Sequence, residues 1–396
     1  MKAYIICKPT VLKPFDRPAS KIRFLGRTVD EWLRERLRAA GLEIVECESL
    51  EALKPDPHSI AIQHDVLASA EFIPRFLALV KGWKQDLQLA FDRGKLPLFS
   101  VRDAATVLRT LPVYYFGERP RQESSKSVEL IPEIVFDTSE GMPQRIGDYT
   151  NLHLYFLDCY GVHIQHWFDL LVANGVFVRE FLVEAVRPFR GILPRRLLYG
   201  ILGNRWVREH SNAVGKGCRI HPTAVLEGCV IGDGVEIGPY CYLRSSVIAD
   251  RAVIREKSTV KVAYVGEGAS IGSTDVTNCY VGAESFILSQ LLNVVIGEGV
   301  FLAGGSGFAD FIFGARSISA SIDGKDVDSG LSFLGSAVGD RTFIGAGLVF
   351  APGRTIPSGV SVLNNHMIKT VPSDPDTVYV ASGGNLLQIP PAFLGR

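Results

Sequence analysis

The chain has 396 residues, of which 47% are hydrophobic and 39 are glycine, so its size and composition fit two globular domains and exclude disordered and fibrous proteins. Lys plus Arg and Asp plus Glu balance at 42 each, so no overall field favours a nucleic-acid partner. No segment approaches the roughly 20 apolar residues of a membrane-spanning helix, and the first residues lack a secretory signal, so we expect a cytoplasmic protein.

Residues 1–150 alternate between strand-like and helix-like segments. Strands are expected in KAYIIC, LEIVEC, SIAIQ and DLQLAF, and helices in TVDEWLRERLRAAG and AEFIPRFLALVKGW. Such alternation predicts an α/β domain with a mostly parallel sheet, which binds ligands beyond the carboxyl ends of its strands. Asp65, next to His64, follows the strand SIAIQ and is the carboxylate expected to hold a metal. A solvated aspartate at a strand end is the alternative.

Residues 151–212 have helical periodicity and many aromatic residues, which predicts a helical connector between two domains. Its basic and aromatic stretch 187–208 could lie on an anionic membrane surface. Because Pro188 and Pro194 interrupt any long amphipathic face, the connector is favoured over peripheral membrane contact.

Residues 213–370 contain an aliphatic residue at every sixth or fifth position. The leading residues are Val214, Ile220, Leu226, Ile231, Ile237, Leu243, Ile248, Ile254, Val260, Val265, Ile271, Val281, Ile296, Val338, Ile344, Phe350, Ile356 and Val362. Steps of six, six and five make one turn of 17 residues, so these hexapeptide repeats predict a left-handed parallel β-helix with three faces. A β-sandwich would instead show alternation and turns every 8–12 residues.

Two further regularities accompany the repeat. The residue four positions after a leading aliphatic is usually small, as expected at the narrow corners of a triangular coil: Cys218, Ala224, Val235, Cys241, Val247, Ala252, Ser258 and Ala269. Glycine often follows the leading residue directly, as at Gly232 and Gly282, and we expect it to supply unusual backbone angles. The seven cysteines include no CxxC pair, so we expect reduced thiols that fill the core.

The front half resembles bifunctional enzymes that join a UDP-N-acetylglucosamine pyrophosphorylase to a glucosamine-1-phosphate acetyltransferase. DRPASKIRFLGRTVDEW parallels a family segment whose lysine assists nucleotidyl transfer, with Ala19 at the position of that lysine. ICKPTVLKP replaces the family's glycine-rich phosphate loop and contains no glycine, as in one bacterial branch of the family. The resemblance implies Mg²⁺ on Asp65, and it implies phosphate contacts from a set of basic residues: Lys8, Lys13, Arg17 and Lys21.

The back half resembles the acetyltransferase prism of the same family. LAGGSGFADFIFGARSISASIDGKDVDSGLSFLGSAVGD parallels the family loop, here about 303–337, that leaves the coil and builds the acyl-donor site against a neighbouring subunit. Asp310 takes the place of an active-site asparagine, while Ile287, Gln290 and Thr277 replace the catalytic histidine, a tyrosine and a lysine. The resemblance therefore implies a homotrimer and acyl-CoA, with polar contacts from Arg244, Lys261, Asp310 and Arg316.

Three functions follow from these observations. The first is a nucleotidyltransferase or acyltransferase that acts on sugar phosphates or nucleotide sugars for cell-envelope polysaccharides. The second is a trimeric binding or scaffold protein that keeps the fold without the chemistry. The third is transfer to another acyl acceptor, with His210, His221 or His366 as the base. Residues 371–396 are expected to form a C-terminal tail.

Overall fold

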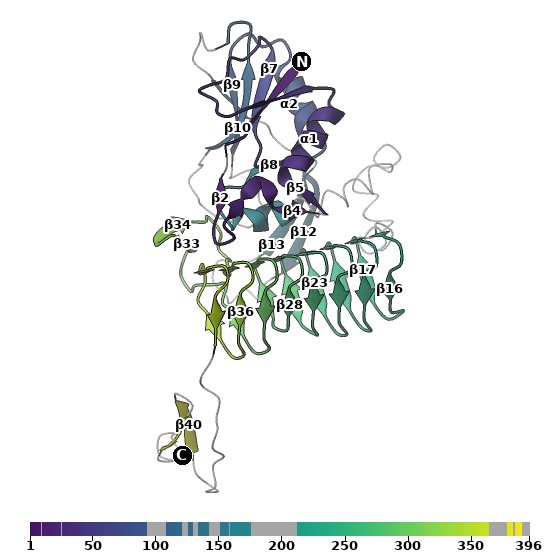
Figure 1. Ribbon diagram of the computed structural model, residues 1–396, viewed down its shortest axis with the longest axis vertical. Helices are drawn as coiled ribbons and strands as arrows, with labels where there is room; N and C mark the ends of the chain where they lie inside the picture. The colour runs from purple at the N-terminus through teal and green to yellow at the C-terminus, as the bar shows by residue number, and fades with distance from the viewer. Residues whose placement is uncertain are drawn as a thin grey trace.

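The structure is a computed structural model. It describes residues 1–92 apart from 9 and 25, and then 108–120, 126–129, 134–141, 151–157, 159–175, 212–363, 378–382 and 385–389. The α/β domain lies along one side of a long triangular coil (Figure 1). No helix among these residues is long and apolar enough to cross a membrane.

A six-stranded sheet in the order β11-β9-β10-β7-β1-β6 forms the centre of the α/β domain. Its strands are β1 (Lys2–Ile6), β6 (Glu43–Cys47), β7 (Ser59–Gln63), β9 (Leu87–Asp92), β10 (Leu108–Phe116) and β11 (Lys126–Glu129). The neighbours β6, β1 and β7 are parallel, whereas β10 runs antiparallel to both β7 and β9. The sheet is thus mixed rather than mostly parallel, because β10 lies between β7 and β9 and runs antiparallel to both.

The two expected helices are confirmed as α1 (Val29–Ala39) and α2 (Phe72–Val80). Thr28 and Glu31 form a reciprocal capping box that fixes the start of α1. Both helices bury apolar residues in the core that they share with the sheet, including Leu33, Leu37 and Phe76. The sequence-based interpretation of this half therefore holds for its elements.

Between β1 and α1 the chain forms a folded loop with short elements. These are β2 (Val11–Leu12), β3 (Arg17–Pro18), the 3₁₀ helix η1 (Ala19–Lys21), β4 (Arg23–Phe24) and β5 (Arg27–Thr28). We refer to residues 10–24 as the docking loop, because its apolar residues Phe15, Ile22 and Phe24 are buried in the cluster that joins the two halves of the chain.

The helical connector expected at 151–212 begins instead with strands. β13 (Asn151–Leu157) pairs with β12 (Ile134–Gly141), and β14 (Gly161–His163) pairs with β8 (Val66–Ala68). Residues 169–175 are helical, whereas 176–211, including the basic stretch 187–208, lie outside the described residues. The aromatic periodicity misled the prediction because edge strands also favour aromatic side chains.

Residues 213–362 form the predicted coil, whose faces are parallel sheets. The first face holds β15 (Ala213–Val214), β18 (Val230–Ile231), β21 (Val247–Ile248), β24 (Tyr264–Val265), β27 (Tyr280–Val281), β30 (Val295–Ile296), β35 (Ala337–Val338) and β38 (Thr355–Ile356). The second holds β16 (Arg219–Ile220), β19 (Glu236–Ile237), β22 (Val253–Ile254), β25 (Ser270–Ile271), β28 (Phe286–Ile287), β31 (Phe301–Leu302), β36 (Phe343–Ile344) and β39 (Ser361–Val362).

The third face is shorter, because the chain leaves the coil within it. It holds β17 (Val225–Glu227), β20 (Tyr242–Arg244), β23 (Thr259–Lys261), β26 (Asp275–Thr277) and β29 (Leu291–Leu292), followed by the pair β32 (Gly307–Phe308) and β37 (Val349–Phe350). Between β32 and β35 the chain forms a protruding hairpin, β33 (Ser319–Ile322) and β34 (Lys325–Asp328). The C-terminal segment contains a second hairpin, β40 (Val378–Ser382) and β41 (Asn385–Ile389).

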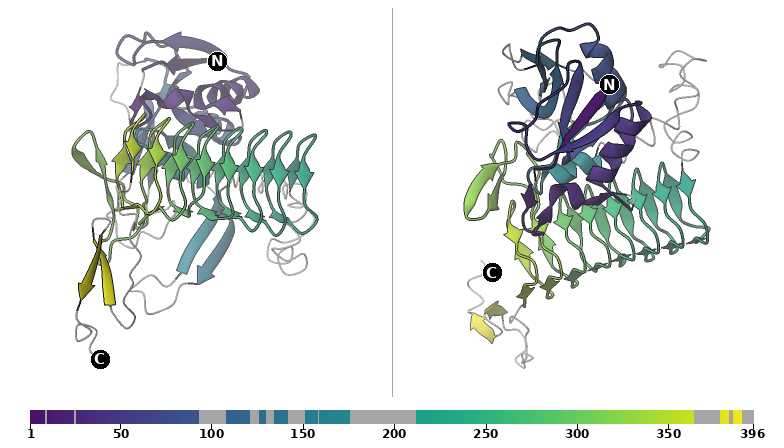
Figure 2. Two further views of the ribbon diagram at one scale, coloured as in Figure 1. Left: turned by 60° about the horizontal axis from the view of Figure 1, so that its bottom comes forward. Right: turned by 45° about the horizontal axis from the view of Figure 1, so that its top comes forward.

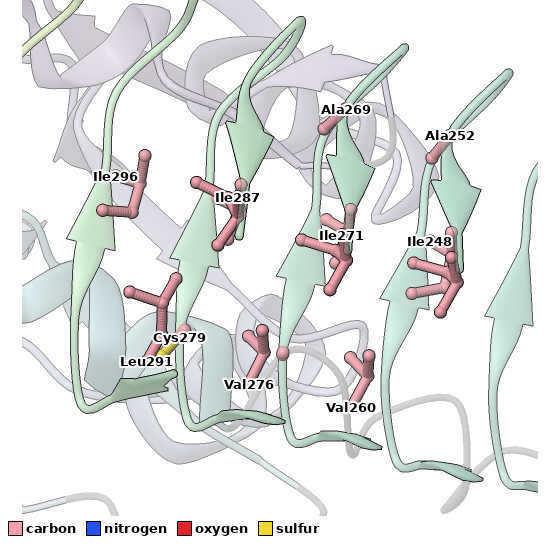
Figure 3. Close-up of a cluster of buried hydrophobic side chains, with 14 of the residues drawn as sticks. Ile248, Ala252, Val260, Ala269, Ile271, Val276, Cys279, Ile287, Leu291 and Ile296 are labelled. Carbon is pink, nitrogen blue, oxygen red and sulfur yellow. The ribbon is translucent and has the colours of Figure 1, made fainter. Parts of the chain in front are cut away.

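The aliphatic residues of the repeat point into the coil. Figure 3 shows Ile248, Ile271 and Ile296 inside it, with the small residues Ala252 and Ala269 at a corner. All five are at most 1% exposed. Val247 was expected among the corner residues, but it packs outward against the α/β domain. The repeat step from Leu243 to Ile248 has five residues instead of six, so the buried Ser246 occupies the corner instead.

The glycines that follow the leading residues have ordinary backbone angles, contrary to expectation. A Cβ added at Gly232 would lie 2.7 Å from the backbone nitrogen of Asp250, and one added at Gly238 would lie equally close to that of Glu256. These positions need glycine because the next coil approaches closely. Positive φ angles occur two residues later, at Gly234 and Gly268 among others.

The α/β domain packs on the first face of the coil, as both views in Figure 2 show. Tyr264 and Tyr280 stack on neighbouring strands with ring centroids 5.0 Å apart. Phe24 of the docking loop meets the edges of both rings, at 5.6 and 5.5 Å. Trp32 of α1 donates a hydrogen bond of 2.9 Å to the carbonyl of Phe24. Aromatic packing of this kind holds the two halves in one arrangement.

Candidate functional site

Arg17, expected to bind substrate phosphate, lies between the two halves of the chain. Its guanidinium donates to the carboxylates of Glu298 and Asp340, which belong to two consecutive coils. Asp340 is 4% exposed. Burial disfavours the charged guanidinium, yet the two carboxylates outweigh that effect and raise the pKa of Arg17 above its usual value. The charge of Arg17 is therefore neutralised by the chain's own carboxylates.

Further contacts close the docking loop onto the coil. The hydroxyl of Ser358 donates to the carbonyl of Pro14 at 2.7 Å, and that of Tyr280 donates to the carbonyl of Arg23 at 3.0 Å. Beneath Arg17 lies a cavity of about 10 Å³, lined in part by Phe15 and Glu298. Since a single water needs roughly 10–15 Å³, this space does not admit a nucleotide phosphate.

Asp65 is fully buried rather than solvated at the end of its strand. Its Oδ2 accepts hydrogen bonds from Thr10 at 2.7 Å and from Gln63 at 3.2 Å. Its Oδ1 lies 3.2 Å from Nε2 of His163, without hydrogen-bond geometry between them. Among the described residues no three His, Cys, Asp or Glu side chains could hold a metal. A hydrated Mg²⁺ needs open oxygen ligands, so this arrangement does not fit one.

The other basic residues that were expected to contact phosphate are exposed or paired with a carboxylate. Lys8 and Lys21 are exposed. Lys13 pairs with Asp16 at 2.5 Å, and this carboxylate raises the pKa of Lys13. Two of the four basic residues expected to contact phosphate, Lys13 and Arg17, are thus already paired with carboxylates of this chain.

On the third face, by contrast, two of the expected residues are neighbours. Arg244 of β20 pairs in register with Lys261 of β23, and Glu227 precedes them in the same column. The Nζ of Lys261 lies 5.9 Å from the ring centre of Tyr242, whose hydroxyl donates to Glu227 at 2.8 Å. Thr277, at the position of the family lysine, is the next residue of the column.

Asp310 lies on the corner that follows the third face. Asn278 donates from Nδ2 to Oδ1 of Asn293 at 2.7 Å, and Asn293 donates from Nδ2 to Oδ2 of Asp310 at 2.7 Å. Burial raises the pKa of Asp310, although the hydrogen bond from Asn293 opposes this. The chain leaves the coil directly after this residue. We refer to Asn278, Asn293 and Asp310 as the amide ladder.

The remaining expected positions lie apart from the ladder. Arg316 is exposed in the protruding segment, where its carbonyl accepts a hydrogen bond from Ser332 at 3.1 Å. Ile287, which replaces the family histidine, is fully buried inside the coil, whereas Gln290 is exposed. The position of the lost base therefore serves the core here.

Only one of the three candidate histidines is described, since His210 and His366 lie outside the described residues. His221 is exposed at a corner after the second face, and its Nδ1 lies 2.9 Å from Oγ1 of Thr223. It lines an open groove of about 460 Å³ together with Arg219 and Arg255. Because Arg219 is paired with Glu236, this groove presents no concentrated positive charge.

The sequence reasoning did not identify three asparagines that surround the candidate site. Asn278 and Asn293 have φ angles of 51° and 55°, and asparagine tolerates this conformation better than most residues. Asn174 is fully buried and donates to the carbonyls of Val262 and Cys279 at 2.9 and 3.1 Å. The signal available in the sequence was the repetition of asparagine 15 residues apart at one corner.

Comparisons with known proteins agree with the coil. Residues 213–245 match the family described as Bacterial transferase hexapeptide (six repeats). The chain is 30% identical over 188 residues to the bifunctional protein GlmU of Stutzerimonas stutzeri, a match that covers 45% of this chain and 41% of that protein. For GlmU of Alkalilimnicola ehrlichii the identity is 32% over 170 residues, covering 38% and 35%.

A mutant GDP-perosamine N-acetyl transferase from Caulobacter crescentus, solved with CoA and GDP-perosamine, is 17% identical and covers 43% of this chain and 60% of that one. The TM-score of this match is 0.18. The chain spans less than half the length of the GlmU proteins that it matches. Its C-terminal part is therefore a hexapeptide-repeat β-helix of the bacterial transferase kind, and the chain is a divergent relative of the GlmU proteins.

Proposed function

We propose that this protein is an acyltransferase whose chemistry takes place on the third face of the coil. It transfers an acyl group from acyl-CoA to an amino sugar that carries a phosphate or a nucleotide. The observation that carries this proposal is the line of polar residues from Arg244 and Lys261 to Asp310, where the chain leaves the coil.

The spacing of the coil supports a substrate of this size. Successive strands of a sheet lie about 4.8 Å apart, so Lys261 and Asp310, three strands apart, are separated by roughly 14 Å along the coil axis. A flexible lysine side chain and a sugar phosphate together span such a distance. Arg244 lies one strand further away, where it can meet a second phosphate of a nucleotide sugar.

The resemblance to the bifunctional pyrophosphorylase and acetyltransferase enzymes supports the chemistry. The protruding segment parallels the family loop that builds the acyl-donor site, and the GlmU relatives are bifunctional proteins. We extend acyl-CoA to this chain as the donor and place its site beside the protruding segment after Asp310. Nucleotidyl transfer with Mg²⁺ is not favoured, because the docking loop contacts the coil and Asp65 is buried among its own partners.

We further propose a homotrimer in which the second face of the coil meets a neighbouring copy. Phe286, Phe301 and Phe343 stack along this face, with successive ring centroids 5.7 and 4.8 Å apart. Phe343 is 40% exposed, and Leu288 and Leu363, at the corner that follows this face, are 37% and 70% exposed. Sedimentation equilibrium tests this proposal, and a monomer at micromolar concentration contradicts it.

A second function, a scaffold without chemistry, is favoured by one observation: the position of the family's base is the buried Ile287. Thermal unfolding with added ligands separates the two functions, because a ligand at 100 times its dissociation constant stabilises the native state by about 2.7 kcal/mol. The acyltransferase is stabilised by acetyl-CoA and by a UDP-amino sugar, but not by UTP with Mg²⁺. A melting temperature unchanged by every ligand favours the scaffold.

A further inference from the structure

The hydrogen bonds of the amide ladder are all donated in the same direction, and the last of them is accepted by a carboxylate. At each step an Nδ2 group donates to an oxygen of the next residue, first from Asn278 to Asn293 and then from Asn293 to Asp310. Both asparagines are held in the left-handed conformation at consecutive corners, so their side chains stack in one column. The ladder therefore holds Asp310 in a fixed orientation.

The two oxygens of Asp310 have different surroundings. Oδ2 accepts the hydrogen bond from Asn293, while Oδ1 has no hydrogen-bond partner on another described residue and is not one of their buried atoms that lack a partner. It therefore keeps some exposure to solvent. The backbone carbonyl of Asp310 accepts from Leu334, which anchors the returning end of the protruding segment beside it. A carboxylate oxygen therefore faces solvent where the chain enters and leaves the coil.

We propose that Asp310 is the proton acceptor of the acyl transfer and that Asn293 is its positioning residue. This inference rests on the proposed function. As the amine nitrogen of the acceptor forms its bond to the thioester carbon, Oδ1 takes the proton that the nitrogen loses. The carbon–sulfur bond then breaks, and the proton passes to the departing CoA thiolate. The products are an amide and free CoA thiol, and no other reactant is needed.

The surroundings of Asp310 suit this role. Burial raises its pKa toward neutrality, and a base is most effective when its pKa lies near the working pH. The titratable neighbour is the thiol of Cys279, whose pKa is raised to about 12, chiefly by burial and also by the charge of Asp310. This thiol stays neutral throughout the pH range of the reaction. Among the described residues, the polar groups that act on the carboxyl are the amide of Asn293 and the backbone amide of Asp310 itself.

The test replaces Asp310 by asparagine, which keeps the acceptor for Asn293 and removes the base. Release of CoA thiol from acetyl-CoA is measured with an amino-sugar phosphate and with a UDP-amino sugar. We expect kcat to fall by about 10²–10⁴-fold in D310N, with KM changed by less than about threefold. The matched control is D56N, because Asp56 is an exposed aspartate of the α/β domain and lies outside the proposed site. Its kcat should equal that of the wild type.

A second variant tests the positioning role. In N293G the corner keeps its left-handed backbone but loses the amide that lowers the pKa of Asp310. The acidic limb of the pH profile of kcat/KM should therefore move to higher pH. A purely structural role for Asn293 would lower the melting temperature and leave that limb in place.

The outcomes separate the two proposals. Thiol release by the wild type together with a large loss in D310N supports both. If the wild type releases thiol and D310N retains more than half of its kcat, Asp310 is not the base and the proposed function stands. If the wild type releases no thiol with either acceptor while its melting temperature shows that it is folded, the proposed function and this inference both fail.

Discussion

The docking loop and the amide ladder both hold carboxylates, but they use them differently. At the docking loop, the guanidinium of Arg17 pairs with the carboxylates of Glu298 and Asp340 from the coil, and a cavity beside Arg17 is about the size of one water. In the amide ladder the carboxylate of Asp310 has an amide partner on one oxygen only. Charge that is neutralised within the chain stabilises the fold, whereas a carboxylate with an open oxygen remains available for chemistry.

The same contrast assigns different roles to the two halves of the protein. The segment that parallels the family's nucleotide site binds the coil through aromatic packing, an ion-pair network and hydrogen bonds. On the third face of the coil, polar side chains occupy neighbouring strands toward the exit of the protruding segment. We therefore regard the α/β domain as a partner that stabilises the coil, and the coil as the part that reacts.

Removal of the aromatic contact between the docking loop and the coil should lower the free energy of unfolding more than any other change considered. Phe24→Ala deletes a fully buried ring that packs against two tyrosines, and such deletions cost about 3–5 kcal/mol. Urea unfolding measures the change. Phe313→Ala is the control, because Phe313 is 87% exposed and its deletion should leave the unfolding free energy within about 0.5 kcal/mol of the wild type. Equal effects of the two variants would show that Phe24 does not join the halves.

Loss of the ion pairs of Arg17 should cause the second largest decrease in the free energy of unfolding. Arg17→Ala leaves the buried carboxylate of Asp340 without its partner, which typically costs about 3 kcal/mol. The surface pair of Arg27 and Glu35 provides the control, since Arg27→Ala should cost at most about 1 kcal/mol. A double variant with Asp340→Asn should recover part of the loss. Chemical denaturation of all three variants checks the prediction, and no recovery would mean that the unpaired charge is not the cause.

A single hydrogen bond between the docking loop and the coil should contribute less to the free energy of unfolding. Tyr280→Phe keeps the stacked ring and removes only the hydroxyl that donates to the carbonyl of Arg23, so we expect a loss of about 1 kcal/mol. Burial raises the pKa of Tyr280 well above its usual value, so the loss should be the same from pH 6 to pH 9. A loss that disappears at pH 9 would contradict this assignment.

The smallest effect concerns the stability of the amide ladder. Because the pKa of Asp310 is higher in the folded protein than in the unfolded chain, its protonated form stabilises the fold at low pH, and this contribution is lost as pH rises through the folded pKa. Asp310→Asn should therefore match the wild type near pH 3.5 and exceed its melting temperature slightly at pH 7. If the melting temperature of Asp310→Asn falls below that of the wild type at pH 7, the carboxylate of Asp310 stabilises the fold and this prediction is wrong.

The coil could be predicted from the sequence because its physical rule is local. An aliphatic residue must face inward once per hexad, and every leading residue from Val214 to Val362 lies at a strand of the coil. The reason for the glycines after them was wrong, because the close approach of Gly232 to the next coil involves residues a full turn away. Periodicity identifies faces but does not show how tightly turns stack.

The candidate site was only partly predictable for a related reason. Arg244, Lys261 and Asp310 were identified by resemblance, and the structure places the first two on adjacent strands. The partners of Arg17 lie 281 and 323 residues away, and no local pattern indicates such contacts. The same holds for Asp65, whose burial depends on Thr10 and His163 from other segments.

The most direct test of the central claim compares the two possible reactions in one preparation of the full chain. One sample receives UTP, Mg²⁺ and an N-acetylated sugar 1-phosphate, and released pyrophosphate is measured. A second receives acetyl-CoA with an amino-sugar phosphate or a UDP-amino sugar, and released thiol is measured. We predict steady thiol release and no pyrophosphate above the rate without enzyme. Pyrophosphate release without thiol release would place the chemistry in the α/β domain and contradict this account.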